Sequence, residues 1–233
     1  KDLNRGESFS LEYDYLLLAT GGKPFIPKVE GVDSKGIYTV RTLEDGAKLK
    51  HAAEKAETIG VVGGGYIGLE MAEAFRKIGR RVLLFQRSRL LRKALDVELS
   101  RDVEQVMVEN GVELHLGEAL QGFKVWEGKV AGVVTDKGEY PVEMVLLALG
   151  VQPNVDLALE MGVELGETGA IRVDGGMRTS LENVYAAGDN VEAVHLVVRG
   201  EFGHMVALRN AKIVSVPLEE AVGQQKLVDP CLL

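Results

Sequence analysis

Three glycines with the spacing GxGxxG, at Gly63, Gly65 and Gly68, point most directly to chemistry. The first allows a tight turn out of a strand. The second lets the main chain approach a pyrophosphate, because no Cβ intervenes, and the third lets a helix pack closely on the strand. The unpaired N–H groups and positive dipole end of that helix favour phosphate. The spacing therefore predicts a dinucleotide-binding turn from Gly63 to Gly68, with Gly64 and Ile67 inside it.

A glycine turn alone is weak evidence, but the elements that must position it are also present. An apolar, β-branched run at 59–62 precedes it and predicts a strand. An amphipathic helix is predicted next, ending at Gly79. Its apolar members are Ile67, Met71, Ala74, Phe75 and Ile78. A second apolar run at 82–85 completes a strand–helix–strand unit. The alternative interpretation is a glycine-rich turn with a structural role only.

The residues after the second run bear on which nucleotide binds. In NAD-binding units an acidic residue roughly 20 positions beyond the glycines binds the ribose 2′-OH. This chain has the uncharged Gln86 there, followed by Arg87 and Lys93. Guanidinium geometry suits a 2′-phosphate, so we predict that NADPH is accepted, with its preference over NADH left open. The alternative is that these charges are simply solvated.

The rest of the central region predicts alternating helix and strand. Asp96 is a plausible N-cap for a further helix, and 112–116 reads as the next strand. A β-meander is expected over 122–135, with Trp126 packed in it, and another strand at 140–149. These elements would extend the strand–helix–strand unit into a full α/β domain.

Composition excludes several classes of function. A net charge of −8 argues against nucleic acid as a partner, because binding its phosphates needs a basic surface. No apolar run reaches the roughly 18 residues that a membrane span requires, so no membrane association is expected. The one cysteine, Cys231, rules out a disulfide framework within the chain, and a cytoplasmic location is expected. No metal site is expected.

Three further stretches carry a family resemblance. Residues 19–31 read ATGGKPFIPKVEG, and the string LLALGVQPN surrounds Gly150. After a strand expected at 170–174, the chain has Thr179, an apolar-Tyr-Ala strand and then Gly188-Asp189. These motifs resemble the flavin-dependent pyridine nucleotide-disulfide reductases. The residues after Asp189 are more similar to the branch with NADH oxidases and coenzyme A-disulfide reductases.

The resemblance implies an α/β fold of a particular kind. It is a Rossmann-like three-layer NAD(P)-binding domain with a β-meander, inserted into the remaining part of an FAD-binding domain. The expected divisions are 1–40 for the first FAD-domain segment, 41–153 for the NAD(P)-binding domain, 154–223 for the returning FAD-domain segment and 224–233 for a tail.

The resemblance also implies FAD and NAD(P)H as cofactors. The residues expected at the FAD are Ala19, Thr20, Gly21, Gly188 and Asp189. Gly150 would contact the nucleotide. Tyr66 would match an aromatic residue that shields the flavin and moves aside for nicotinamide, and Glu70 an acid near the flavin that pairs with a lysine.

The activity implied is that of an intact relative. Hydride would pass from NAD(P)H to FAD and on to a small-molecule disulfide or to oxygen, in a homodimer. Three family parts are missing from the sequence: the N-terminal FAD half, the redox cysteine within it, and the C-terminal interface domain. The chain is therefore expected to be a fragment, inactive on its own. Two alternatives stay open: a nucleotide-binding module without its own chemistry, and a reductase of a protein partner such as a ferredoxin.

Overall fold

The computed structural model describes residues 4–191, 204–209 and 212–217. The chain forms two compact units, one of Lys1–Gly22 with Pro153–Leu233 and one of Lys23–Gln152. The polypeptide passes from one unit to the other twice, once within β2 (Gly22–Pro24) and once within β11 (Val151–Pro153). These two strands pair with each other. The roles expected for the chain's segments remain a prediction.

A five-stranded parallel sheet forms the centre of the unit 23–152, with strand order β3-β10-β4-β5-β6. The strands are β3 (Ile37–Tyr38), β4 (Thr58–Val62), β5 (Arg81–Gln86), β6 (Val112–Leu116) and β10 (Met144–Leu147). The innermost strands are nearly continuous apolar runs because both faces of a parallel sheet are covered.

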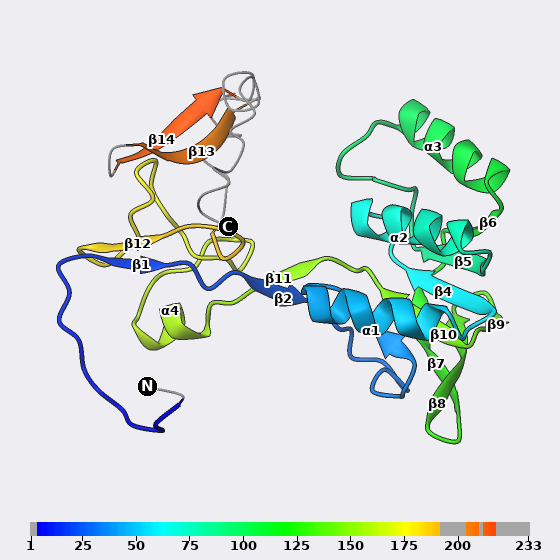
Figure 1. Ribbon diagram of the computed structural model, residues 1–233. Coiled ribbons are helices and arrows are strands. Elements are labelled where there is room, and N and C mark those ends of the chain that lie inside the picture. The colour runs from blue at the N-terminus through cyan, green and yellow to red at the C-terminus, as the bar shows by residue number, and fades with distance from the viewer. Residues whose placement is uncertain (1–3, 192–203, 210–211, 218–233) are drawn as a thin grey trace, which may run out of the picture. The chain divides into compact units, whose positions relative to one another are not determined.

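Helices cover one face of this sheet and an antiparallel meander covers the other (Figure 1). The helices are α1 (Leu43–Ala53), α2 (Tyr66–Lys77) and α3 (Val97–Glu109), and the meander is β7 (Leu120–Trp126), β8 (Lys129–Thr135) and β9 (Glu139–Pro141). Alternate residues of β5 show the layering, since Val82 and Leu84 pack with the helices whereas Leu83 and Phe85 pack with the meander. The predicted three-layer α/β fold with a β-meander is confirmed.

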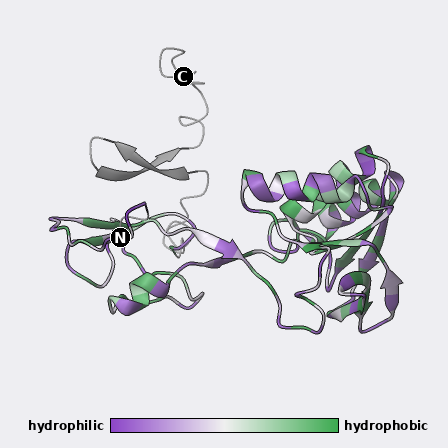
Figure 2. Cartoon of the chain, turned by 60° about the horizontal axis from the view of Figure 1, so that its bottom comes forward, coloured by the Kyte–Doolittle hydropathy of each residue, from purple (hydrophilic) through white to green (hydrophobic). Residues whose placement is uncertain are grey.

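The buried face of α2 is offset from the predicted one. Ile67 and Ile78 are 42% and 47% exposed, whereas Gly68, Ala72 and Phe75 are buried. A Cβ at Gly68 would lie only 1.9 Å from the carbonyl oxygen of Gly63. This close contact turns the helix by about one residue from the face that its largest side chains suggest. The helices of this unit carry both hydrophobic and hydrophilic bands (Figure 2).

Two expectations about the meander region are wrong. Trp126 is 72% exposed, because it ends β7 beside the turn at Glu127-Gly128, beyond the layer it was expected to join. The strand expected at 140–149 is two strands, since β9 belongs to the meander and β10 to the parallel sheet.

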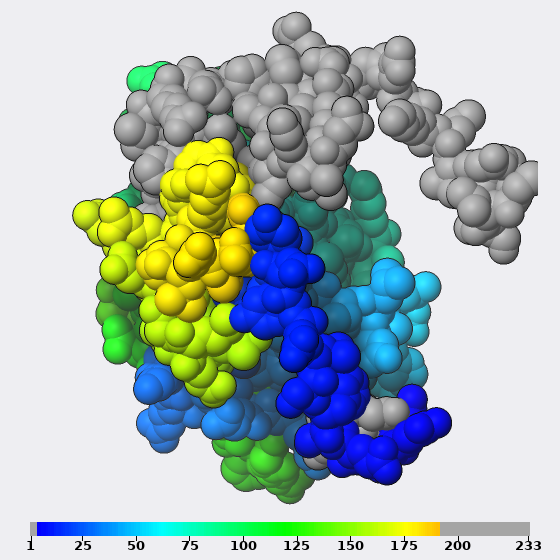
Figure 3. Space-filling model, turned by 90° about the vertical axis from the view of Figure 1, so that its left-hand side faces the viewer, coloured from blue at the N-terminus to red at the C-terminus, as the bar shows by residue number. Residues whose placement is uncertain are grey.

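The other unit has a small core around a parallel pair of strands, β1 (Leu16–Leu18) and β12 (Val184–Ala186). Figure 3 shows the N-terminal segment in blue beside the yellow residues near 180. The strand expected at 170–174 is absent, and Ile171 makes only isolated bridges. This unit also contains α4 (Asp156–Glu160) and the antiparallel pair β13 (His204–Arg209) and β14 (Lys212–Pro217). Among the described helices, none has the length and apolar character to cross a bilayer.

The N-cap of α3 gives a test of this fold. Asp96 Oδ1 accepts a hydrogen bond from the Leu99 N–H at 3.0 Å. We expect Asp96→Ala to lower the free energy of unfolding by about 1 kcal/mol, because one N–H at the helix start loses its partner. Urea denaturation followed by circular dichroism measures the change. Asp96→Asn keeps an acceptor and should retain most of the stability; an alanine variant as stable as the parent would contradict the cap.

Candidate functional site

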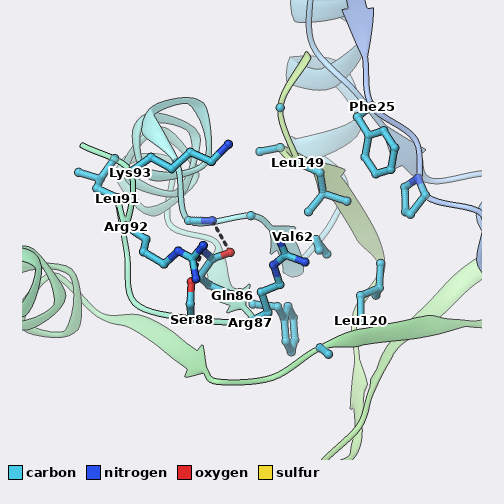
Figure 4. A pocket seen from close by; sticks show the side chains of 18 of the residues that line it. Phe25, Val62, Gln86, Arg87, Ser88, Leu91, Arg92, Lys93, Leu120 and Leu149 are labelled. Carbon is cyan, nitrogen blue, oxygen red and sulfur yellow. Dashed lines mark hydrogen bonds between the residues drawn. The ribbon is translucent and has the colours of Figure 1, made fainter. Parts of the chain in front are cut away.

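A cleft of about 600 Å³ opens in the unit 23–152, beside the carboxyl ends of β4, β5 and β10. Ligands of open α/β sheets bind at this edge, and the volume is in the range of small-molecule sites. Arg92 and Lys93 reach it from one side and Phe25 and Leu149 from the other, with Arg87 between them (Figure 4). The cleft therefore has a basic end and an apolar end.

The glycine turn forms one wall of this cleft. Gly63 has a φ of +117°, and a Cβ there would lie 2.2 Å from the carbonyl oxygen of Ala148, so only glycine fits. Gly65 is the N-cap of α2 and makes no side-chain cap, and a Cβ there would meet nothing within 4 Å. The start of α2 therefore presents bare main chain, as the sequence predicted for Gly63 and Gly65.

Gly64 and Gln86 form a contact that sequence reasoning did not supply. A Cβ at Gly64 would lie 2.5 Å from Leu90 Cδ2 and 3.1 Å from Gln86 Cγ. The Gly64 N–H donates to Gln86 Oε1 at 3.3 Å (Figure 4). Gln86 Nε2 is 3.3 Å from Ser88 Oγ and 3.4 Å from the Arg89 carbonyl oxygen. Gln86 therefore joins the glycine turn to the loop of residues 87–96 that follows β5, which we call the basic loop.

The structure separates the basic residues of the loop into two groups. Arg87, Arg92 and Lys93 line the cleft and are exposed. Arg89 does not line it and donates to main-chain carbonyl oxygens instead. The sequence prediction for Arg87 and Lys93 agrees with their position in the cleft, and Arg92 joins them there.

The other candidate nucleotide-site residues of this unit also form two groups, those that line the cleft and those that do not. Gly150 and Tyr66 line the cleft, and Tyr66 is 63% exposed. Ile67, Gly68 and Glu70 are not among the lining residues. Gly68 instead sets the contact between α2 and β4. The binding and catalytic roles of all these residues remain predictions.

Sequence reasoning missed the apolar end of the cleft. Phe25, Leu120 and Leu149 line it, and the Phe25 N–H donates to the Gly150 carbonyl oxygen at 2.9 Å. The only available signal for Phe25 was the neighbouring prolines, which predict an extended segment but not what that segment contacts. The meander residue Leu120 carried no signal at all.

A series of hydrogen-bonding side chains, Arg81, Glu113, His115 and Glu118, runs from the surface to the cleft. Glu118 lines the cleft yet is only 8% exposed. Its oxygens lie 2.8 Å from Thr135 Oγ1 and 3.3 Å from His115 Nδ1. His115 Nε2 is 3.1 Å from Glu113, and the second oxygen of Glu113 is 2.7 Å from Arg81 Nη2. Each buried polar side chain in this series therefore has a hydrogen-bond partner, as burial requires.

These contacts lower the pKa values of both carboxyl groups. Burial alone would raise the pKa of Glu118, but hydrogen bonds from its neighbours, first from Thr135, outweigh burial and hold that pKa below its ordinary value. The hydrogen bond from Arg81 lowers the pKa of Glu113. Both carboxyl groups are consequently favoured in the charged form.

The unit of residues 1–22 and 153–233 brings the other candidate residues together. The Leu18 carbonyl oxygen, at the end of β1, accepts from the Ala187 N–H and from Asn190 Nδ2, both at 3.0 Å. Because β1 and β12 are parallel, Ala19-Thr20-Gly21 and Gly188-Asp189 follow them at the same edge. Asn190, a residue that sequence reasoning missed, ties these two turns together.

A second asparagine orders the first of these turns. Asn154 Nδ2 donates to the Thr20 carbonyl oxygen at 2.9 Å, and Thr20 Oγ1 donates to the Asn154 carbonyl oxygen at 2.6 Å. The Asn154 N–H also donates to the Gly21 carbonyl oxygen at 2.9 Å. The hydroxyl of Thr20 and the carbonyl oxygens of Thr20 and Gly21 are thus used within the protein.

Comparison with known proteins identifies the family. The family model described as pyridine nucleotide-disulphide oxidoreductase matches residues 1–207. A curated relative from Pyrococcus abyssi, named NAD(P)H sulfur oxidoreductase (CoA-dependent), is 46% identical over 193 residues, which are 81% of this chain and 42% of the relative. The chain belongs to the pyridine nucleotide-disulphide oxidoreductase family.

Solved structures show the same fold. The water-forming NADH oxidase from Lactobacillus brevis, bound to NADH, is 30% identical with a TM-score of 0.76. An engineered NADPH oxidase made from it, bound to NADPH, is 31% identical with a TM-score of 0.76. Each comparison covers 94% of this chain and 46% of the solved chain. The chain spans less than half the length of these relatives.

The lowered carboxyl pKa values predict how stability depends on pH. Because the pKa of Glu118 and of Glu113 is lower in the folded protein, both groups stabilise it above their ordinary pKa of 4.5, and this contribution is lost as the pH falls through the lower folded values. Thermal unfolding from pH 6 down to about pH 3 measures it. We expect Glu118→Gln to flatten the acid dependence, while Glu54→Gln, which removes a charge at an exposed site, should keep the parent's profile.

Proposed function

We propose that the cleft binds the adenosine and pyrophosphate portion of NAD(P)H. The observation that carries this proposal is the bare main chain at Gly65 and the start of α2, which faces the same cleft as three basic side chains. Main-chain N–H groups at a helix start suit a pyrophosphate. The apolar end, with Phe25 and Leu149, suits the adenine ring.

NADPH is the proposed ligand in preference to NADH. Gln86 carries no charge that would repel a 2′-phosphate, and its side chain is engaged with Gly64 and the loop. Arg87, Arg92 and Lys93 supply the positive charge at the same end of the cleft. An arginine is well suited to phosphate because its planar guanidinium donates two parallel hydrogen bonds.

The substitutions of the engineered NADPH oxidase support this preference. Three consecutive residues of the parent oxidase, aspartate, alanine and methionine, became alanine, arginine and serine, and a proline five positions later became arginine. This chain has Gln86-Arg87-Ser88 and then Lys93 at the same spacing. A fifth substitution, glycine to alanine 18 positions before the aspartate, has no counterpart here, because Gly68 stands at that spacing.

FAD is the cofactor proposed for the other unit. Gly188 has a φ of +95° and Gly21 one of +63°, so both turns depend on glycine, and the two turns meet at the end of the β1–β12 pair. The main chain of Ala19-Thr20-Gly21 and the carboxylate of Asp189 would hold the flavin and ribityl part. FAD would accept hydride from NAD(P)H and pass the electrons on.

The whole protein is proposed to be an NAD(P)H-dependent flavoprotein oxidoreductase. Its proposed electron acceptor is a small-molecule sulfur compound such as a disulfide, supported by the name of the Pyrococcus abyssi relative at 46% identity. Oxygen is the second candidate, supported by the Lactobacillus brevis oxidase at 30% identity.

Two residues of α2 are proposed to serve the hydride transfer. Tyr66 lines the cleft at the helix start and is 63% exposed, as a ring that shields the reacting centre and moves aside for nicotinamide must be. Glu70 lies one turn further along α2 and is exposed. It is outside the cleft, so its proposed role concerns the flavin and not the adenosine portion.

Reversal of one charge tests the NADPH proposal. We expect Arg87→Glu to raise the Kd for NADPH about 10- to 100-fold, because a carboxylate then faces the 2′-phosphate, and to change the Kd for NADH by less than about threefold. Calorimetric titration of the 233-residue chain with each dinucleotide measures both values. Arg101→Glu is the matched control, since it makes the same charge change on α3 away from the cleft.

The outcomes separate the parts of the proposal. A parent chain that binds neither dinucleotide would remove the nucleotide site altogether. Equal affinity for the two dinucleotides, unaltered in Arg87→Glu, would remove only the preference for NADPH.

A second variant tests Glu70. In the flavin-loaded whole protein, Glu70→Ala should slow the loss of flavin absorbance on mixing with NADPH about tenfold or more. The Kd for NADPH should stay within about twofold, because Glu70 is outside the cleft. Glu73→Ala, one turn further along α2, is the control. Flavin reduction at the parent's rate in Glu70→Ala would exclude the proposed role.

A further inference from the structure

Arg89 holds the basic loop together from inside. The loop runs from residue 87 to residue 96, between β5 and α3. Arg89 Nη1 donates to the carbonyl oxygens of Leu95 at 2.7 Å and Asp96 at 2.9 Å, and Nη2 donates to that of Arg92 at 3.2 Å. One guanidinium thus closes the loop on itself by three hydrogen bonds, which its fixed fork of donors makes possible.

The beginning of the loop is fixed to its surroundings. The Leu91 N–H donates to the Gly64 carbonyl oxygen at 2.9 Å, and the Leu90 carbonyl oxygen accepts from Ser100 Oγ at 2.5 Å. The Leu90 side chain is completely buried. Leu91 has a φ of +49°, a conformation that a leucine adopts only where its surroundings hold it.

The cleft-lining cations have no such support of their own. Arg87, Arg92 and Lys93 are exposed, and none of them uses its charged group in a hydrogen bond or ion pair with a described residue. Their positions therefore depend on the main chain that carries them. Arg89 fixes that main chain directly at Arg92 and, through Leu95 and Asp96, on the far side of Lys93.

We propose that Arg89 is a positioning residue for recognition of the ribose 2′-phosphate. It holds Arg92 and Lys93 at the basic end of the cleft without touching the nucleotide. This proposal rests on the proposed function, because it needs a 2′-phosphate at that end. A loop ordered before binding loses less conformational freedom on binding, and the affinity gain follows from that saving.

The same reasoning predicts selectivity. Two of the three bonds made by Arg89 are exposed, so water replaces the guanidinium when it is removed and the loop loosens without general unfolding. NADPH then loses ordered cations at its 2′-phosphate. NADH, which has no 2′-phosphate, keeps the glycine turn and the start of α2.

The test compares Arg89→Ala and Arg89→Lys with the parent by calorimetric titration with NADPH, NADH and 2′,5′-ADP. We expect Arg89→Ala to raise the Kd for NADPH and for 2′,5′-ADP about tenfold, equal to about 1.4 kcal/mol, and to change the Kd for NADH by less than about twofold. Arg89→Lys should remain at least about threefold weaker than the parent for NADPH, because a single ammonium does not reach three carbonyl oxygens.

Arg76→Ala is the matched control. Arg76 also donates to main-chain carbonyl oxygens, those of Arg80 at 2.6 Å and Asn110 at 3.1 Å, but it lies outside the cleft. Its loss should lower the thermal unfolding temperature and leave the ratio of the two dinucleotide affinities unchanged. If Arg89→Ala does not fold by circular dichroism, Arg89→Lys and Arg89→Gln carry the test.

Each outcome has a defined meaning. A parent that binds neither dinucleotide overturns the proposed nucleotide site, and this inference with it. A parent that binds both equally, with no effect of Arg87→Glu, overturns the proposed preference for NADPH and again this inference. A parent that prefers NADPH, with Arg89→Ala binding NADPH as well as the parent or weakening both dinucleotides equally, overturns only the role of Arg89. Full recovery of NADPH affinity in Arg89→Lys would show that the charge acts directly and would overturn the positioning role.

Discussion

The structure of the unit 23–152 depends on one place where main chain packs against main chain without side chains between. At the end of β4, the Cβ that Gly63 lacks would lie 2.2 Å from the Ala148 carbonyl oxygen, and the one that Gly68 lacks would lie 1.9 Å from the Gly63 carbonyl oxygen. β4, β10 and α2 come together only because these two positions are glycine. The direction of α2, its buried face and the bare wall of the cleft all follow from this contact.

The loop after β5 shows how a protein with a net charge of −8 builds a local basic site. The loop has four basic residues, Arg87, Arg89, Arg92 and Lys93. On composition alone all four would serve the same electrostatic purpose, but Arg89 has a different use from Arg87 and Arg92. Arg89 orders main chain, whereas Arg87 and Arg92 present charge to the cleft. A guanidinium suits both tasks, and only its hydrogen-bond partners distinguish them.

Side-chain amides play a comparable part in both units. Gln86 connects the glycine turn to the basic loop through Gly64. Asn154 and Asn190 fix the two turns that follow β1 and β12, through Thr20 and Leu18. An amide offers a donor and an acceptor without charge, so it orders main chain next to a proposed ligand site without adding a negative charge that would repel a phosphate.

The sequence by itself determined the elements whose cause is local. Glycine spacing, the apolar runs of β4 and β5 and the cap at Asp96 are set by neighbours in the chain, and they predicted the strand–helix–strand unit with its glycine turn. The three-layer α/β fold was what the family resemblance implied. Tertiary structure decided the rest: the face that α2 buries, the exposure of Trp126, the approach of Phe25 and Leu120 to the cleft, and the use of Arg89 inside its loop. These features depend on which distant main chain comes within hydrogen-bond or van der Waals distance, and neither periodicity nor residue type contains that information.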